Sequence, residues 1–408
     1  MKHTLSFPHE KLQGKIALPT SKSISNRLLI IKALSSDGFP IEGLSVSDDT
    51  QALQNGLQTE ADVIDAGHAG TSMRFLTAYF AATGRAKTIT GSDRMKNRPM
   101  SDLVNALNNL GADIRYLEKE GFPPIQTSGK PLSGNSVEIN GDVSSQFISA
   151  LLMVAPTLPD GLTVCIKGEL VSVPYVKMTL ELMRQAGVNA TWKDNTIVVA
   201  PQDYHSEGMT VERDWSAASY WYQMAVLAKD AELLLEGATE KSLQGDAIIS
   251  HIARTSGIKT EYTPEGALLT KDRNTCLTLG LDFMYMPDLA QTMAVTCCLN
   301  NTRFLFTGLQ TLRLKETDRI AALQNELLKL GYRIEETKPG VLEWKGERVE
   351  PQQPISISTY QDHRMAMAFA PAAICFQGLQ IEDTEVVSKS YPNFWNDLKN
   401  VGFEVCEG

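Results

Sequence analysis

The strongest constraint on the fold is a regular spacing of glycines that end predicted helices along the 408-residue chain. Each glycine follows an amphipathic helical pattern and precedes a short alternating segment. Glycine just past a helix end is the usual left-handed stop. Successive stops are 70 to 76 residues apart, at Gly111, Gly187, Gly257, Gly331 and Gly402. Residues 49–56 are interpreted as a truncated earlier copy of the same pattern.

A second set of predicted helices runs in step with the first. Each begins with polar or charged residues and continues as an apolar run, near residues 23–27, 70–72, 144–146, 214–216, 287–288 and 362–364. Two helices and short strands in every unit of roughly seventy residues predict six repeats. No unit has the polar face of a solenoid cap, so two domains of three repeats each are expected, with a boundary near residues 210–225.

Composition restricts the class of protein. The chain is 43% hydrophobic and carries a net charge of −10, which is typical of a globular protein without a general nucleic-acid or anionic-membrane partner. No apolar run approaches the ~18 residues of a membrane span. Six cysteines without CxxC spacing favour buried, reduced thiols and a cytoplasmic location. HExxH is absent, so a metal site built by the protein is not expected.

The polar helix starts are candidate anion sites, because a helix N-terminus offers free N–H groups and a partial positive charge. Lys22 and Arg27 add two cations at the first of them; a capped helix with two solvated cations is the alternative. The glycine-bounded turn at residues 67–74, which contains Gly70 and Arg74, allows close backbone approach to an anion, although a tight turn with an N-cap is the more common explanation of such a motif.

Further candidates in the first half are a run of three cations at residues 94–98 and hydroxyls before the later helices. Cations before a helix oppose its dipole unless an anion lies nearby, which favours a ligand at Arg98. Ser144, Ser145 and Gln146 fit either a ligand site or a capping box. Ser172 and Tyr175 could add hydroxyl donors.

The second half supplies carboxylates as well as cations. Asp288 opens a helix in an apolar stretch and is a general-base candidate. Residues 312–319 are expected on a helix, with Lys315 and Arg319 on one face and Glu316 paired to Arg319; an exposed ion-pair helix is the alternative. The charged residues at 362–364 open an apolar helix, which makes His363 and Arg364 candidates. Lys389 lies in a polar loop.

Together these cations recur along an otherwise acidic chain and predict substrates with several negative charges. Carboxylates among the cations suit proton transfer around such substrates without a metal or organic cofactor. The cations are Lys22, Arg27, Arg74, Arg98, Lys315, Arg319, Arg364 and Lys389.

In these motifs the chain resembles the 3-phosphoshikimate 1-carboxyvinyltransferase (EPSP synthase) family, nearly end to end. The shared motifs are Ser21-Lys22-Ser23-Ile24-Ser25-Asn26-Arg27, Ala69-Gly70-Thr71-Ser72-Met73-Arg74, Arg94-Met95-Lys96-Asn97-Arg98-Pro99, Ser144-Ser145-Gln146-Phe147, Lys315-Glu316-Thr317-Asp318-Arg319 and Asp362-His363-Arg364-Met365-Ala366-Met367. The resemblance implies an α/β fold, a two-domain inside-out α/β barrel with three βαβαββ repeats in each domain. It places residues 20–213 in one lobe, and residues 1–19 with 214–408 in the other.

The resemblance also implies transfer of the enolpyruvyl group of phosphoenolpyruvate to the 5-hydroxyl of shikimate 3-phosphate. Shikimate 3-phosphate would be bound by Lys22, Ser23, Arg27, Ser144, Ser145, Gln146, Ser172, Tyr175, Asp288, Thr311 and Lys315. Phosphoenolpyruvate would be bound by Lys22, Gly70, Arg98, Gln146, Arg319, Arg364 and Lys389. The catalytic residues would be Asp288, Lys315, Glu316 and Lys22, with Asp288 as base and Glu316 as the acid that protonates the methylene carbon. The implied enzyme uses no cofactor or metal, binds neither nucleic acid nor membrane, and is expected to be a cytoplasmic monomer.

Several positions depart from the family pattern. They are Thr20, His68, Phe75, Thr311 and the segment Glu212-Arg213-Asp214-Trp215-Ser216. Two alternatives stay open. UDP-N-acetylglucosamine 1-carboxyvinyltransferase shares the fold, but it has Asn where Ser23 follows Lys22 and usually a loop cysteine. A non-catalytic anion-binding homologue would need the cations but not both carboxylates.

Overall fold

The computed structural model describes residues 1–272 and 276–408. It divides into two compact units: unit 1 contains Met1–Pro19 and Glu212–Gly408, and unit 2 contains Thr20–Val211. The chain therefore passes from one unit to the other after Pro19 and again after Val211. Each unit is described below by itself.

Four-stranded sheets of one topology recur in both units. The first two strands of each sheet pair in parallel, and the other two pairings are antiparallel. Unit 2 contains two such sheets, with strands in the order β4 (Val63–Asp65), β5 (Ala86–Thr90), β7 (Ile125–Ser128), β6 (Ile114–Tyr116), and β8 (Ser136–Asn140), β9 (Leu162–Lys167), β11 (Thr196–Val199), β10 (Ala190–Lys193).

Unit 1 repeats this topology three times. The sheets are β2 (Lys11–Ala17), β13 (Asp230–Glu236), β15 (Gly266–Lys271), β14 (Ile258–Thr263); β16 (Thr278–Asp282), β17 (Arg303–Thr307), β19 (Val341–Trp344), β18 (Glu335–Lys338); and β20 (Ser356–Ile357), β21 (Leu379–Glu382), β1 (Lys2–Ser6), β22 (Glu404–Glu407). The N-terminal strand β1 lies between β21 and β22, which explains why the first residues belong to unit 1.

The sixth repeat is shorter. Over the described residues its sheet is the parallel pair β12 (Met209–Thr210) and β3 (Ile41–Glu42). Its helices are α1 (Lys22–Leu34) and α2 (Asp48–Gln58), and α2 contains the segment interpreted as a truncated copy. The prediction of six repeats in an α/β fold is therefore confirmed, with one repeat reduced to two strands.

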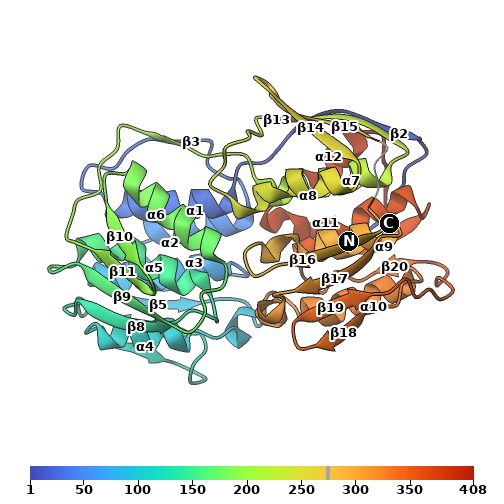
Figure 1. Ribbon diagram of the computed structural model, residues 1–408. Helices are drawn as coiled ribbons and strands as arrows, with labels where there is room; N and C mark the ends of the chain where they lie inside the picture. The colour runs from blue at the N-terminus through green and yellow to red at the C-terminus, as the bar shows by residue number, and fades with distance from the viewer. Residues whose placement is uncertain (273–275) are drawn as a thin grey trace. The chain divides into compact units, whose positions relative to one another are not determined.

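The helices with polar starts pack together within each unit, and Figure 1 labels all of them. In unit 2 these are α1, α3 (Gly70–Ala82) and α5 (Ser145–Val154), which contact one another. In unit 1 they are α7 (Trp215–Leu227), α9 (Ala290–Leu299) and α11 (His363–Phe369), where α9 contacts both others. Nearly every residue of α3, α5, α7, α9 and α11 is buried, because these helices are apolar on all sides.

The helices that end in the spaced glycines are α4 (Ser101–Asn109), α6 (Val173–Gln185), α8 (Ile249–Thr255), α10 (Arg319–Lys329) and α12 (Phe394–Asn400). The glycine after each has φ between 83° and 105°, so the predicted left-handed stops are confirmed. Seven short 3₁₀ helices complete the described elements: η1 (Met95–Asn97), η2 (Ala155–Thr157), η3 (Gly245–Ile248), η4 (Pro287–Leu289), η5 (Gln310–Leu314), η6 (Ala370–Ile374) and η7 (Thr384–Lys389).

Two expectations are wrong. Residues 312–319 do not form one helix: η5 ends at Leu314, Lys315 is extended, and α10 begins at Arg319. The Asp318 side chain accepts a hydrogen bond from the backbone N–H of Ala321 at 3.1 Å, and this N-cap fixes the start of α10.

The six cysteines are free, but only Cys297 and Cys298 are buried. Over the described residues, no helix is long and apolar enough to cross a membrane.

Candidate functional site

The start of α1 in unit 2 carries a buried ion pair. Lys22 is the first residue of the helix, and its Nζ lies 2.9 Å from Oδ2 of Asp49 on α2. Their side chains are 15% and 4% exposed. The backbone carbonyl of Asp49 also accepts a hydrogen bond from the Ser72 hydroxyl on α3 at 2.7 Å. Asp49 was not among the predicted site residues; its place in the first turn of a predicted helix was the one available signal.

Arg27 lies one turn further along α1 and is almost completely buried. Its guanidinium donates hydrogen bonds to the Thr179 hydroxyl, the Ser23 carbonyl, the Ser149 hydroxyl and the Tyr175 carbonyl, at 2.7 to 3.4 Å. The ring of Phe75, a departure from the family pattern, has its centroid 5.6 Å from the Arg27 Cζ. Burial lowers the pKa of Arg27 to about 10, which leaves it a cation at neutral pH.

The start of α3 brings two further arginines against Gly70. Arg74 donates to the Gly70 carbonyl at 2.8 Å, and both Arg74 and Arg98 are buried. A Cβ placed on Gly70 would collide with the Arg98 guanidinium and would lie 2.6 Å from Arg74 Nη1. A larger residue here would therefore push the ends of these two arginine side chains away from the start of α3. His68 contacts Ser92 in the same region, with Nδ1 3.0 Å from the hydroxyl oxygen.

The α5 start joins this region through Gln146, whose side-chain amide donates to the Thr71 hydroxyl at 3.0 Å. Ser144 is the N-cap of α5 and accepts from the Gln146 backbone N–H at 3.3 Å, so the capping interpretation holds for that serine. Ser172 precedes α6 with φ of 57°, an uncommon conformation for serine. Its side chain makes no cap hydrogen bond.

Unit 1 holds the two predicted carboxylates beside buried arginines. Asp288 in η4 lies between Arg364 of α11, with Nη2 2.8 Å from Oδ2, and Arg319 of α10, with Nη1 3.4 Å from Oδ1. The other predicted carboxylate, Glu316, also contacts Arg319, with 2.9 Å between Oε2 and Nη2. Its second oxygen lies 3.3 Å from Lys389 Nζ. One buried guanidinium therefore bridges Asp288 and Glu316.

Arg319 is held in place by a third carboxylate. Its Nε donates to Oδ2 of Asp362 at 2.7 Å, and Asp362 also caps α11 by accepting from the Arg364 backbone N–H. Burial opposes the Arg319 charge, but Asp362 and Glu316 raise its pKa above the ordinary value. His363 follows Asp362 and is also buried. Thr311 is buried in η5, while Lys315 follows that short helix.

Three further residues adjoin this cluster in unit 1. The Ser216 hydroxyl on α7 lies 3.4 Å from Arg364 Nη2 and hydrogen-bonds to the Asp246 carboxylate in η3. Tyr220 on α7 lies 3.5 Å from Arg364 Nη1, and burial raises its pKa to about 12. No sequence signal pointed to Asp246, because its neighbours in the cluster come from distant parts of the chain.

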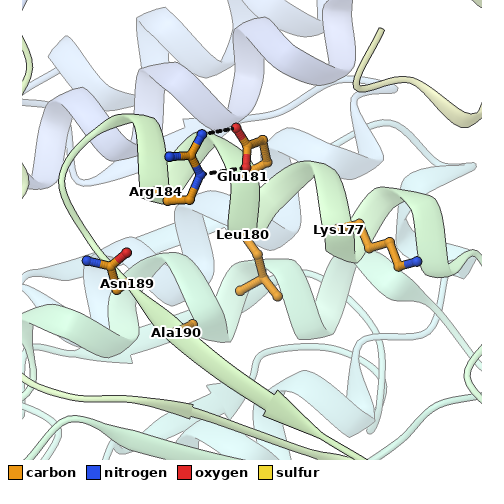
Figure 2. A pocket seen from close by; sticks show the side chains of 6 residues that line it. All are labelled: Lys177, Leu180, Glu181, Arg184, Asn189 and Ala190. Atoms are coloured by element: carbon orange, nitrogen blue, oxygen red, sulfur yellow. Dashed lines mark hydrogen bonds and ion pairs between the residues drawn. The ribbon is translucent and has the colours of Figure 1, made fainter. Parts of the chain in front are cut away.

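A surface pocket of about 340 Å³ lies apart from these residues, on α6 and β10 in unit 2 (Figure 2). Figure 2 shows its one ion pair, between Arg184 and Glu181 of α6, at 2.6 Å. These two side chains are 61% and 31% exposed, so the pair is solvated and gives the pocket no buried ligand-binding group. Within the described residues, no group of three or more His, Cys, Asp or Glu side chains could hold a metal ion.

Comparisons with known proteins agree on one family. A family model described as EPSP synthase (3-phosphoshikimate 1-carboxyvinyltransferase) matches residues 52–398. A 3-phosphoshikimate 1-carboxyvinyltransferase of Bacteroides fragilis is 50% identical over 409 residues, covering 100% of both chains. Another, from Shewanella pealeana, is 35% identical and covers 97% of this chain and 98% of its own.

The fold has solved counterparts. The structure of an EPSP synthase from Acinetobacter baumannii superposes with a TM-score of 0.78 and covers 100% of both chains. Its sequence identity of 21% supports the same fold.

Proposed function

The chain belongs to the EPSP synthase (3-phosphoshikimate 1-carboxyvinyltransferase) family, and from this premise we propose that it joins phosphoenolpyruvate to the 5-hydroxyl of shikimate 3-phosphate. The products are 5-enolpyruvylshikimate 3-phosphate and phosphate. The chain is thus a transferase of the shikimate pathway. One observation supports this assignment on the chain's own residues: the Arg319 guanidinium contacts both Asp288 and Glu316.

The proposed reaction is an addition followed by an elimination. Glu316 gives a proton to C3 of phosphoenolpyruvate, which makes C2 electrophilic. The 5-hydroxyl oxygen then bonds to C2 while Asp288 takes the hydroxyl proton. Glu316 then takes a proton back from C3, which restores the double bond as the C2–O bond to phosphate breaks. The proton held by Asp288 passes to the departing phosphate, so both carboxylates return to their starting states. The charge on the departing phosphate is offset by fixed cations, for which Arg319, Arg364 and Lys389 are the candidates in unit 1.

The cations and hydroxyls of unit 2 are proposed to bind the same two substrates. Ser23 and Arg27 would hold the shikimate carboxylate, and the 3-phosphate would be held by Ser144, Ser145, Ser172 and Tyr175. Lys22, Gly70, Arg98 and Gln146 would contact phosphoenolpyruvate, while Thr311 and Lys315 of unit 1 would contact shikimate 3-phosphate. Buried cations and helix starts at these positions support the assignment, since both bind anions well.

The proposal also covers the roles of the two units, the oligomeric state and the location of the enzyme. Unit 2 corresponds to the lobe that holds most of the shikimate 3-phosphate residues. Unit 1 corresponds to the lobe that contains Asp288, Lys315 and Glu316. We further propose that the enzyme acts as a monomer. We also propose that it works in the cytoplasm. Size-exclusion chromatography with light scattering tests whether the protein is a monomer, and a stable dimer would contradict that proposal.

Phosphate release by the purified protein tests the function. We expect release with phosphoenolpyruvate and shikimate 3-phosphate together, and none when either is omitted. A parallel reaction replaces shikimate 3-phosphate with UDP-N-acetylglucosamine. Release only in that reaction would favour the related transferase, and binding without release in either would favour a non-catalytic homologue.

A further inference from the structure

Asp246 is a buried carboxylate that neither the mechanism nor the predicted binding residues use. It lies in η3, just before α8, and is 3% exposed. One oxygen, Oδ2, accepts a hydrogen bond from the Ser216 hydroxyl. The other, Oδ1, is buried without a hydrogen-bond partner among the described residues. A buried carboxylate with one unsatisfied oxygen is costly, which calls for a reason to keep it.

The hydrogen bonds around Ser216 connect Asp246 to the candidate site. Because the Ser216 hydroxyl donates its proton to Asp246, its lone pairs are left to accept from Arg364 Nη2, at 3.4 Å. The same Nη2 lies 2.8 Å from Oδ2 of Asp288. Arg364 Nη1 lies 3.3 Å from the Asp288 backbone carbonyl. Asp246 therefore fixes the direction of the Ser216 hydroxyl, and Ser216 in turn holds one edge of the guanidinium.

We propose that Asp246 is a positioning residue, which acts through Ser216 to hold the Arg364 guanidinium against Asp288 in the geometry that binds phosphoenolpyruvate. The inference rests on the proposed function, since that function assigns Arg364 to this substrate. Asp246 itself contacts neither substrate in this scheme.

The charges around Asp246 make its effect sensitive to pH. Asp214 caps α7, Asp288 lies in η4 and Arg364 in α11, whereas His251 and Arg254 of α8 are exposed. Burial and the charge of Asp288 raise the pKa of Asp246 to about 7. Above that pH its negative charge offsets part of the Arg364 charge. Anion binding is then expected to weaken between pH 6 and pH 8.

The test compares kcat/KM for phosphoenolpyruvate in Ser216→Ala, Asp246→Ala, their double variant and Asp246→Asn. Loss of a hydrogen bond of about 1 kcal/mol corresponds to a roughly fivefold fall. At pH 6, where Asp246 is mostly neutral, we expect this fall in each alanine variant. The double variant should show the same fall and no larger one, because the two residues act through one hydrogen-bonded connection. Asp246→Asn retains an acceptor for Ser216 and should keep the wild-type value at pH 6 while losing the decline toward pH 8.

The matched control is Asp230→Asn, the same substitution at an exposed position of β13, and it should match the wild type throughout. Independent, multiplicative losses in the double variant, or an unchanged pH profile in Asp246→Asn, would overturn the proposal. So would a fall in melting temperature with unchanged kcat/KM in the alanine variants.

Wild-type turnover in the same assay separates this inference from the proposed function. If the wild type releases phosphate, the function stands whatever the variants do. If it does not, calorimetric titration with phosphoenolpyruvate decides the inference alone. Roughly fivefold weaker binding in Ser216→Ala and Asp246→Ala would support it, and unchanged binding would overturn it.

Discussion

Arg319 and Asp362 form an ion pair that is buried on both sides, with 2.7 Å between Nε and Oδ2 and side chains that are 2% and 0% exposed. Asp362 compensates a cation that cannot reach water, and it also caps α11. The same guanidinium reaches Asp288 and Glu316. Folding and the proposed chemistry therefore depend on one arginine.

Removing Asp362 should destabilise the protein strongly. Asp362→Ala leaves the Arg319 charge without its buried partner and removes an N-cap, so we expect the free energy of unfolding to fall by about 3–5 kcal/mol. Asp362→Asn keeps the cap oxygen and should lose less. Urea unfolding measures both, with Glu10→Gln as control, because its partner Lys229 is 72% exposed. Equal stability of Asp362→Ala and the wild type would contradict the buried pair.

Replacing Glu316 should separate catalysis from binding. The amide of Glu316→Gln can still accept from Arg319 but cannot supply the proton for C3, so kcat should fall by about 10²–10⁴ while substrate binding persists. Steady-state kinetics and calorimetry measure the two effects. Glu335→Gln, at an exposed position of β18, is the control. Nearly full turnover in Glu316→Gln would exclude the assigned role.

A methyl group at Gly70 should weaken phosphoenolpyruvate binding. The new Cβ would meet the Arg98 and Arg74 guanidinium groups and displace them, without straining the backbone. We expect Gly70→Ala to raise KM for phosphoenolpyruvate about tenfold, equivalent to about 1.4 kcal/mol, with little change in melting temperature. At Gly280 the nearest atom to an added Cβ is 3.9 Å away, so Gly280→Ala is the control. An unchanged KM in Gly70→Ala would argue against a ligand at these arginines.

Asp246 should make stability fall as pH rises. Its pKa is about 7 in the folded protein, against an ordinary value of 3.8, so between these values the folded chain binds more protons than the unfolded chain. The free energy of unfolding therefore decreases from about pH 4 to about pH 7 through this group. Asp246→Asn should flatten that part of the profile, measured by urea unfolding at each pH. A decline as steep as in the wild type would contradict the raised pKa.

The sequence by itself determined the repeats, the helix ends at the spaced glycines and several of the polar helix starts. Glycine stops such as Gly111 and Gly331 could be predicted because a left-handed helix end is a local property of the backbone. Polar starts such as Ser144 could be predicted because capping involves residues two or three positions apart. The family resemblance likewise depended on short motifs that can be read without coordinates.

Only the tertiary structure decided which side chains share an environment. The sequence placed Lys315 on a helix that in fact starts at Arg319, since local periodicity could not identify Asp318 as the cap. It missed Asp49 beside Lys22, and Asp246 behind Ser216 and Arg364. These partners come from different helices, 27 to 148 residues apart in the chain. Packing of buried helices brings them together, and ion pairing and burial then act over distances in space that the order of residues does not encode.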